Sequence, residues 1–269
     1  MANKNKRNYL KAILFLLAVQ LNVLSFSQTS NEVSSLYPEL KRGMNKVSNC
    51  TGLLAIKNKM SRNDSALKVI NVLHIGDSHV KAGIFSETLI SKMNEWYGQA
   101  INANAFFNAQ TFCKTGTRYS DYNELIELDQ QLISTQPNLV IISLGTNDAF
   151  SGSAKKNFYE KVDHLVKKVQ SLSPSSTVIF TTPPDALRKS RRTGGYEAVS
   201  DLKYVTNVIV QYATHHRFAY WNLHEIMGSN YSINTWVTRK LAANDRVHFT
   251  AKGYTILGEW FFEAMKNCL

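Results

Sequence analysis

The sequence predicts a single α/β domain in which helices cover both faces of a parallel sheet. Short apolar runs of strand length recur along the chain, and each is followed by a segment with helical periodicity. The runs are mostly apolar rather than alternating, which is typical of strands that are buried on both faces. With 269 residues, 44% of them hydrophobic and 19% charged, the chain is long enough to bury one large core. We therefore expect a three-layer α/β/α sandwich, without an internal repeat or a second domain.

The first 27 residues have the organisation of a secretory signal peptide. Four basic residues precede an apolar stretch over residues 12–19, and the small-x-small triplet Ser25-Phe26-Ser27 follows as a cleavage site. Gln20 and Asn22 interrupt the apolar stretch, which disfavours a membrane-spanning helix. We therefore expect residues 1–27 to be removed and the protein to be exported, either to the periplasm or out of the cell.

The sheet begins after a lead-in segment, which we place at residues 28–68 with a short helix over residues 51–60. The run from Val69 to Ile75 is rich in β-branched residues and is ended by Gly76, which predicts the first buried strand. Helical spacing begins soon after Ser78 and passes through Phe85, Leu89, Met93 and Trp96. Ser78 is therefore expected at a sharp strand-to-helix turn, at the carboxyl end of the first strand.

The rest of the chain, to the end of a domain that we place at residues 69–269, continues the alternation. Further strands are predicted at residues 103–107, 139–144, 177–182 and 218–221. Helices are predicted where apolar residues recur at spacings of three and four: Leu125, Leu128 and Leu132; Phe158, Val162, Leu165, Val166 and Val169; Val199, Leu202, Val205, Ile209 and Tyr212; and Tyr254, Leu257, Phe261 and Met265. Ser120-Asp121 is a cap signal for the first of these helices. A long loop separates the last strand from the last helix.

Three cysteines, Cys50, Cys113 and Cys268, remain after cleavage, so at least one of them is unpaired within a monomer. A bridge between Cys50 and Cys268, near the two ends of the domain, is possible in an exported protein. Pairing depends on geometry that the sequence does not contain, so the alternatives stay open. No spacing of cysteine and histidine indicates a zinc site, and we expect neither a metal nor another cofactor.

Charge places only weak limits on the partners of the protein. Removal of the signal peptide takes away four basic and no acidic residues, which lowers the net charge from +11 to +7. A basic surface outside the cytoplasm favours anionic glycans or a membrane face, although solubility alone also explains it. The densest basic cluster, residues 188–192, is typical of a solvated loop. No basic run is interleaved with aromatic residues as in nucleic-acid binding, so we expect no nucleic-acid partner.

Polar stretches stand at the points where strands end or helices begin. They are Gly76-Asp77-Ser78-His79, Thr115-Gly116-Thr117, Gly145-Thr146-Asn147-Asp148 and Asp245-Arg246-Val247-His248. Taken singly, Ser78 is also explained as a helix cap and Asn147 as an Asx turn. Because the carboxyl ends of parallel strands meet at one edge of a sheet, we expect these stretches to gather there.

Together these residues supply what acyl transfer needs. Ser78 can act as the nucleophile, His248 can accept its proton, and Asp245 can hold the other ring nitrogen of the histidine. The backbone N–H groups of Ser78 and Gly116, with the side chain of Asn147, can stabilise a developing oxyanion. The residues therefore favour a serine esterase that needs no metal.

These residues resemble those of a known superfamily. Ser78, Gly116, Asn147 and His248 occur in the order of the four namesake residues of the SGNH hydrolases, also called GDSL esterases, and Asp245-x-x-His248 is similar to their last block. The resemblance runs from about Val69 to the C-terminus and implies a flavodoxin-like SGNH hydrolase fold. His79 stands where leucine is usual. This variant, with Tyr220-Trp221-Asn222-Leu223 and Val247-His248-Phe249-Thr250, resembles an exported bacterial branch that includes peptidoglycan O-acetylesterases.

The resemblance implies that the substrate is an O-acetyl ester on a carbohydrate, such as peptidoglycan or another polysaccharide. Other functions stay open: a lipase or lysophospholipase-type esterase, a sugar O-acetyltransferase that uses the same triad, or an inactive glycan-binding module. A flavodoxin-like nucleotide binder is disfavoured, because the turn after the first strand has too few glycines for a phosphate loop.

Other histidine, tryptophan and arginine side chains are assigned from their positions along the chain. We expect His79, Trp236 and Arg246 to contact substrate, with a structural role equally possible for His79. His74 lies within a buried strand and is expected to be a core histidine with hydrogen-bond partners. The remaining histidines, His164, His215, His216 and His224, are expected on the surface or in loops.

Overall fold

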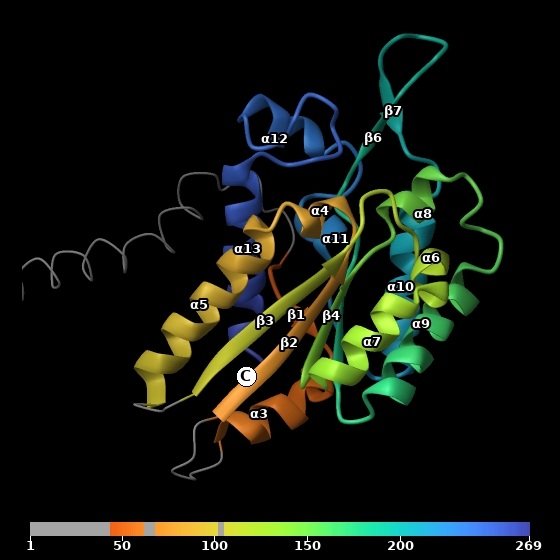
Figure 1. The fold of residues 1–269 in the computed structure, drawn as a ribbon. Helices are drawn as coiled ribbons and strands as arrows, with labels where there is room; N and C mark the ends of the chain where they lie inside the picture. Colours follow the sequence, from red (N-terminus) through yellow and green to blue (C-terminus); the bar gives the residue numbers. More distant parts are fainter. Residues whose placement is uncertain (1–43, 62–67, 102–104) are drawn as a thin grey trace, which may run out of the picture. The chain divides into compact units, whose positions relative to one another are not determined.

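The computed structural model describes residues 44–61, 68–101 and 105–269, so the predicted signal peptide lies outside the described residues. Its centre is a six-stranded sheet with the order β1-β8-β5-β4-β2-β3 (Figure 1). The strands are β1 (Val47–Ser48), β2 (Lys68–Gly76), β3 (Ala105–Cys113), β4 (Leu139–Ser143), β5 (Thr177–Thr181) and β8 (Ala219–Trp221). All pairs are parallel except the edge pair β1–β8, which is antiparallel.

Helices cover both faces of this sheet, which confirms the predicted three-layer α/β/α sandwich (Figure 1). On one face lie α5 (Ile84–Ile101) and α13 (Ala251–Lys266), which pack against each other. On the other lie α6 (Tyr119–Glu124), α7 (Ile126–Thr135), α9 (Phe158–Leu172) and α10 (Leu202–His215). Along β2, Leu73 and Ile75 point into the core beneath α9, whereas His74 reaches Ser86 on α5. The strand is therefore buried on both faces, as its apolar sequence predicts.

The helix expected around Leu125, Leu128 and Leu132 is two helices. Leu125 has an extended backbone, with φ −78° and ψ 112°, and separates α6 from α7. Ser120-Asp121 lies inside α6 rather than before it, and the cap is Arg118, whose N–H donates to the carboxylate of Asp121. The helix marked by Leu128 and Leu132 is confirmed as α7, but its expected start after Ser120-Asp121 was wrong, because α7 begins only after the extended residue Leu125.

Several short elements were not predicted. They are β1, η2 (Cys50–Leu53), α4 (Ser78–Lys81), α8 (Thr146–Phe150), the hairpin of β6 (Leu187–Lys189) and β7 (Tyr196–Ala198), α11 (Leu223–Ile226) and α12 (Ile233–Thr238). None spans more than two helical turns or three strand residues, so periodicity carries little signal. The expected short helix near residue 55 is α3 (Leu54–Ser61). Strand β1 lies within the segment expected as a lead-in, yet it forms one edge of the sheet.

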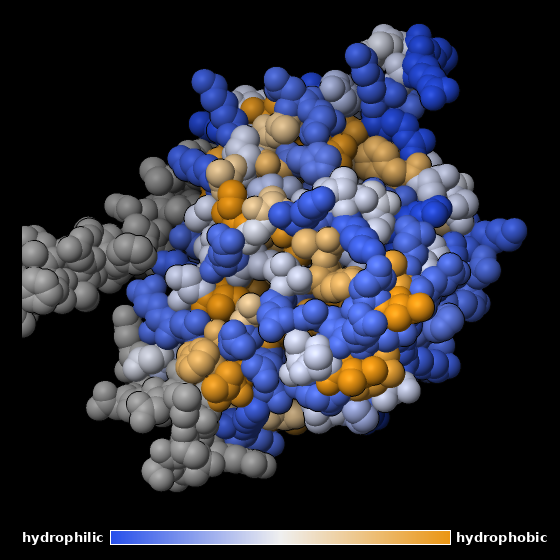
Figure 2. Space-filling view, viewed as in Figure 1, coloured by the Kyte–Doolittle hydropathy of each residue, from blue (hydrophilic) through white to orange (hydrophobic). Residues whose placement is uncertain are grey.

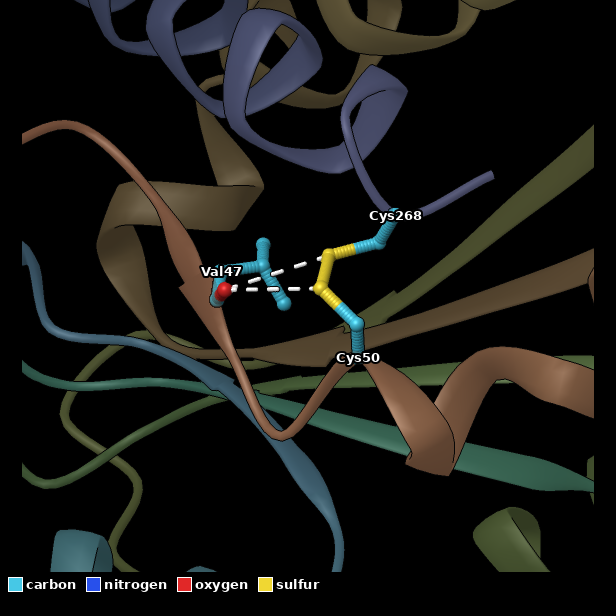
Figure 3. The surroundings of a disulfide bond; sticks show 3 residues. All are labelled: Val47, Cys50 and Cys268. Atoms are coloured by element: carbon cyan, nitrogen blue, oxygen red, sulfur yellow. Dashed lines mark hydrogen bonds between the residues drawn. A yellow bond between two sulfur atoms is a disulfide. The ribbon is translucent and has the colours of Figure 1, made fainter.

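A disulfide joins Cys50 of η2 to Cys268, just beyond α13 (Figure 3). Their Cα atoms are 5.1 Å apart, and 218 residues separate them along the chain. The carbonyl oxygen of Val47 in β1 lies 3.6 Å and 3.8 Å from the two sulfur atoms. Cys113 is free. The structure thus decides the pairing that the sequence left open.

Within the described ranges, no helix combines the length and the apolar composition needed to cross a membrane.

Candidate active site

Ser78 lies at the C-terminal end of β2, where the chain turns at once into α4. The turn is tight, because a Cβ added to Gly76 would lie 2.1 Å from Cγ2 of Val80. Asp77 caps α4, since its Oδ1 accepts a 3.0 Å hydrogen bond from the N–H of His79. The expected sharp turn at Ser78 is therefore present, and the Ser78 side chain stays partly exposed at the edge of the sheet.

Ser78, His248 and Asp245 form one continuous hydrogen-bonded relay. Ser78 Oγ lies 2.9 Å from Nε2 of His248, and Nδ1 of His248 lies 2.7 Å from Oδ2 of Asp245. An ionised carboxylate only accepts hydrogen bonds, so Nδ1 carries the ring proton and donates it to Asp245. Nε2 is then unprotonated and accepts the hydrogen bond of the Ser78 hydroxyl. This is the arrangement that a general base requires.

The carboxylate of Asp245 is held by its own loop. Its Oδ1 accepts hydrogen bonds from the N–H groups of Val247 at 2.9 Å and His248 at 3.0 Å. Burial by itself would raise the pKa of Asp245, but the bonds from the His248 ring and from these N–H groups outweigh burial and lower this pKa. Asp245 therefore stays ionised and keeps the proton on Nδ1 of His248. The side chains of His248 and Asp245 are 41% and 49% exposed, so the relay lies at the surface.

Asn147 stands beside the relay, in the first turn of α8. Its Nδ2 donates to the carbonyl oxygen of Thr117 at 3.0 Å and to Oδ2 of Asp77 at 3.2 Å. Gly116 adjoins Thr117 in an exposed turn and has a φ of 79°, which favours glycine. A Cβ added to Gly116 would meet no atom within 4 Å, so the space beside it is open. The contact between Thr117 and Asn147 brings the turn of Gly116 to the same edge of the sheet as Ser78.

Below the relay lies a buried polar layer made by Asp77 and His79, which are 1% and 8% exposed. Asp77 accepts hydrogen bonds from both Asn147 and His79, and thereby links α8 to α4. Burial raises the pKa of Asp77 to about 6, and burial together with the field of His248 lowers the pKa of His79 to about 3. Asp77 is not among the site residues predicted from the sequence, where only its place beside Ser78 hints at a role.

The residues expected to contact substrate lie differently from that expectation. His79 is buried, with its ring centroid 5.4 Å from that of His248 and its Nδ1 3.1 Å from the hydroxyl of Tyr254. Trp236 is 0% exposed and offers a substrate no surface. Arg246 is partly exposed, but its guanidinium donates to Asn234 Oδ1 at 2.6 Å and stacks 4.1 Å from the ring centroid of Tyr196. His79 and Trp236 are therefore buried rather than facing a substrate: the ring of His79 lies beside that of His248, and the ring of Trp236 packs against that of Phe249.

A second serine–histidine cluster lies inside the protein. His74 is 1% exposed, and its two ring nitrogens lie 2.8 Å from Ser86 Oγ and 2.8 Å from Ser143 Oγ. Burial lowers its pKa to about 3, so the ring is neutral. No carboxylate hydrogen-bonds to this ring in the described residues, and no solvent reaches it. This cluster matches the expected buried histidine with satisfied hydrogen bonds.

Three of the remaining histidines, His164, His215 and His216, are exposed as expected. His224 is instead 4% exposed, so its expected surface position was wrong. It lies in α11, which follows β8 directly, and its backbone N–H donates to the hydroxyl of Thr182 at 3.2 Å. In the described residues, no group of three or more histidine, cysteine, aspartate or glutamate side chains is placed to hold a metal ion.

Comparison with solved structures finds several proteins of the same architecture. The structure of a peptidoglycan O-acetylesterase is similar with a TM-score of 0.67 and 15% identity, over 80% of this chain and 95% of that one. The structure of an acetyl xylan esterase, AlAXEase, is similar with a TM-score of 0.55 and 19% identity, over 72% of this chain and 99% of that one. The structure of a lipase/acylhydrolase from Enterococcus faecalis is similar with a TM-score of 0.54 and 19% identity, over 74% of this chain and 96% of that one. At these identities the likeness shows the fold.

The sequence comparisons identify the family. No curated protein matches the chain at a significant level. The model of the GDSL-like lipase/acylhydrolase family, however, matches residues 74–256, which is more than half of the chain and includes Ser78, Asn147 and His248. The chain belongs to the GDSL-like lipase/acylhydrolase family of the SGNH hydrolase superfamily.

Proposed function

We propose that this chain is an exported serine esterase that removes O-acetyl groups from a carbohydrate, such as peptidoglycan or another polysaccharide. The observation that carries the proposal is the relay from Ser78 through His248 to Asp245, with hydrogen-bond distances of 2.9 Å and 2.7 Å. In this proposal Ser78 is the nucleophile, His248 the general base and acid, and Asp245 the residue that orients the histidine. Gly116 and Asn147 complete the oxyanion hole.

The relay supports a two-step acyl transfer. Ser78 Oγ attacks the carbonyl carbon of the acetyl group while its proton passes to Nε2 of His248. The tetrahedral intermediate collapses, the sugar oxygen leaves, and His248 returns the proton to it. Water then attacks the acetyl-Ser78 carbonyl, again giving a proton to His248, and acetate leaves as Ser78 takes the proton back. Each cycle consumes one ester and one water and releases one alcohol and one acetate.

The oxyanion that forms in each step needs hydrogen-bond donors that are already in place. The backbone N–H groups of Ser78 and Gly116 and the amide of Asn147 are the donors that we assign. Asn147 is already oriented by its hydrogen bonds to the carbonyl oxygen of Thr117 and to Oδ2 of Asp77, and because its amide has only two N–H protons, one of these bonds gives way to the oxyanion when charge develops. Such a donor contributes roughly 3–4 kcal/mol in comparable esterase and protease sites.

Two observations support a polymeric carbohydrate as the substrate. The relay lies at the surface rather than at the bottom of a deep pocket, so a bulky chain can approach Ser78. The similar structures include proteins described as a peptidoglycan O-acetylesterase and an acetyl xylan esterase. Export is supported by the signal peptide predicted at residues 1–27 and by the Cys50–Cys268 disulfide, because disulfides persist in oxidising compartments.

The nucleophile is tested by comparing the two serine–histidine clusters of the chain. Ser78→Ala should fold normally and lose hydrolysis of a chromogenic acetate ester by about 10³-fold or more. Ser86→Ala removes a serine hydroxyl from the buried His74 and should keep the rate, because no substrate reaches it. A phosphonylating reagent should add its mass to the peptide that contains Ser78. A Ser78→Ala variant that keeps its rate, with label on another peptide, would overturn the assignment.

The substrate is tested by measuring acyl release from acetylated peptidoglycan, acetylated xylan and a lysophospholipid. Faster release of acetate from either carbohydrate supports the proposal. Faster release of fatty acid from the lysophospholipid would replace it with a lipase-type function. Transfer of acetyl to an added sugar, in preference to water, would replace it with a transferase.

A further inference from the structure

The β6–β7 hairpin carries a concentration of positive charge. Between Leu187 and Ala198 the chain has four basic side chains, Arg188, Lys189, Arg191 and Arg192, and one acidic side chain, Glu197. The hairpin projects from the edge of the sheet, and Figure 2 shows hydrophilic residues over its tip (Figures 1 and 2). Lys189, Arg191 and Arg192 are exposed, and none of the four basic residues forms an ion pair within the described part of the chain.

This hairpin is tied to the loop that carries Asp245 and His248. The N–H of Leu187 donates to the carbonyl oxygen of Arg246 at 3.0 Å. The hydroxyl of Tyr196 donates to the carbonyl oxygen of Asn244 at 2.8 Å, and its ring stacks against the Arg246 guanidinium. The base of the hairpin is therefore hydrogen-bonded to the residues on both sides of Asp245.

Between the hairpin and α8 lies an open groove of about 660 Å³, lined by Phe150, the basic segment 188–192 and Glu197. Arg188 closes its floor, because Nη2 donates to the carbonyl oxygen of Phe150 at 2.6 Å and the guanidinium lies 5.4 Å from the Phe150 ring centroid. Phe150 ends α8, the helix in whose first turn Asn147 lies. One wall of the groove is thus anchored to the catalytic loop and the other to the helix of the oxyanion donor.

We propose that this groove binds the carboxylate groups of the polysaccharide, so that the substrate of the esterase is an acetylated acidic glycan. The inference rests on the proposed function and narrows its substrate class. Guanidinium groups bind carboxylates through two parallel hydrogen bonds, and the uncompensated charge attracts a polyanion before contact. A glycan chain seated in the groove would run toward Ser78, because the groove walls lead to the elements that hold Asp245, His248 and Asn147.

The test compares an acidic and a neutral polymer. We expect Arg191→Gln with Arg192→Gln to lower kcat/KM on acetylated polygalacturonate by about tenfold at low salt, through KM. The same double variant should leave acetylated dextran and a chromogenic acetate ester unchanged, and added salt should shrink the difference. The matched control, Lys57→Gln with Lys266→Gln, removes the same charge from exposed positions in α3 and α13 and should change nothing.

Several outcomes would overturn the inference. They are an equal loss on acidic and neutral polymers, no loss on either, and the same loss in the control variant. If the wild-type protein hydrolyses none of these esters, the proposed function fails, and binding then tests the groove by itself. Retardation of the wild type in gels that contain polygalacturonate, relieved in the arginine variant, supports a glycan groove. Equal retardation by duplex DNA or binding to anionic vesicles would instead show general anion binding.

Discussion

At the scale of single residues, Asp77 connects the proposed oxyanion donor to the helix of the proposed nucleophile. Its carboxylate accepts hydrogen bonds from Asn147 and from the N–H of His79, and it is almost completely buried. Burial raises its pKa to about 6, so it is mostly neutral below pH 6 and mostly ionised above it. The bond that orients Asn147 is therefore charge-assisted only on the alkaline side of this value.

We expect the ratio of kcat of the wild type to kcat of Asp77→Asn to rise with pH, with a midpoint at about 6. Below the midpoint both side chains are neutral and the ratio is near unity. Above it the wild type gains roughly 1 kcal/mol from the charged acceptor, a factor of about five. Rates of a chromogenic acetate ester across the pH range provide the measurement.

Asp185 offers a matched control for this experiment. Burial also raises its pKa to about 6, but its carboxylate accepts hydrogen bonds from Ser232 and Ile233 at the start of α12, away from Asn147. The ratio of kcat of the wild type to kcat of Asp185→Asn should not change with pH. A flat ratio for Asp77→Asn as well would show that the charge of Asp77 does not act on the reaction.

At the scale of elements, the turn from β2 to α4 depends on Gly76. A Cβ at this position would lie 2.1 Å from Cγ2 and 2.5 Å from Cβ of Val80, and 3.2 Å from the carbonyl oxygen of Ser143. Gly76→Ala should therefore push α4 away from the sheet, displace Ser78, and lower the unfolding free energy by about 1–3 kcal/mol. Ester hydrolysis should fall with it, because small displacements of a nucleophile are costly.

The side chain of Val80 provides the decisive comparison. Because the closest contacts are with Val80, Gly76→Ala combined with Val80→Ala should recover part of the lost hydrolysis, and the losses of thermal stability should not add. Gly98→Ala is the control, since its added Cβ meets no atom within 4 Å and it lies in α5, where alanine is favoured over glycine. Additive losses, with no recovery of hydrolysis, would show that the turn is not limited by this contact.

At the scale of the whole molecule, the Cys50–Cys268 disulfide joins the described N-terminal elements to the end of the last helix. Strand β1 pairs with β8 through only two residues, so the edge of the sheet holds few hydrogen bonds of its own. A cross-link between two positions that are 218 residues apart restricts the conformations of the unfolded chain. Cys50→Ser with Cys268→Ser should lower the unfolding free energy by about 2–4 kcal/mol. Ester hydrolysis at low temperature should persist, because the Ser78–His248 contact does not involve these residues.

Denaturant unfolding with and without a reducing agent measures this effect. The reductant should lower the stability of the wild type and leave that of the double serine variant unchanged. Cys113→Ser, which alters the free cysteine, should respond to the reductant as the wild type does. If the wild type unfolds at the same denaturant concentration with and without reductant, the bridge does not stabilise the fold.

Much of this molecule was predictable because the relevant signals are local. The apolar run at 69–75 and the helical stripe of α9 each need only a few neighbouring residues, and both lie where they were expected. The residues of the proposed triad could also be identified from the sequence, since Ser78 follows a predicted strand and Asp245 stands three residues before His248. The division into α6 and α7 was missed because one extended residue, Leu125, decides it.

The sequence by itself determined the fold class, the main strands and helices, and the residue types that gather at one edge of the sheet, because periodicity and turn chemistry act over short distances along the chain. Only the tertiary structure decided that Ser78 meets His248 across 170 residues, that Cys50 pairs with Cys268, and that Trp236 is buried. It also decided that the basic hairpin is hydrogen-bonded to the loop that carries Asp245. These contacts depend on strand order and on how the layers pack, and no local pattern encodes either of them.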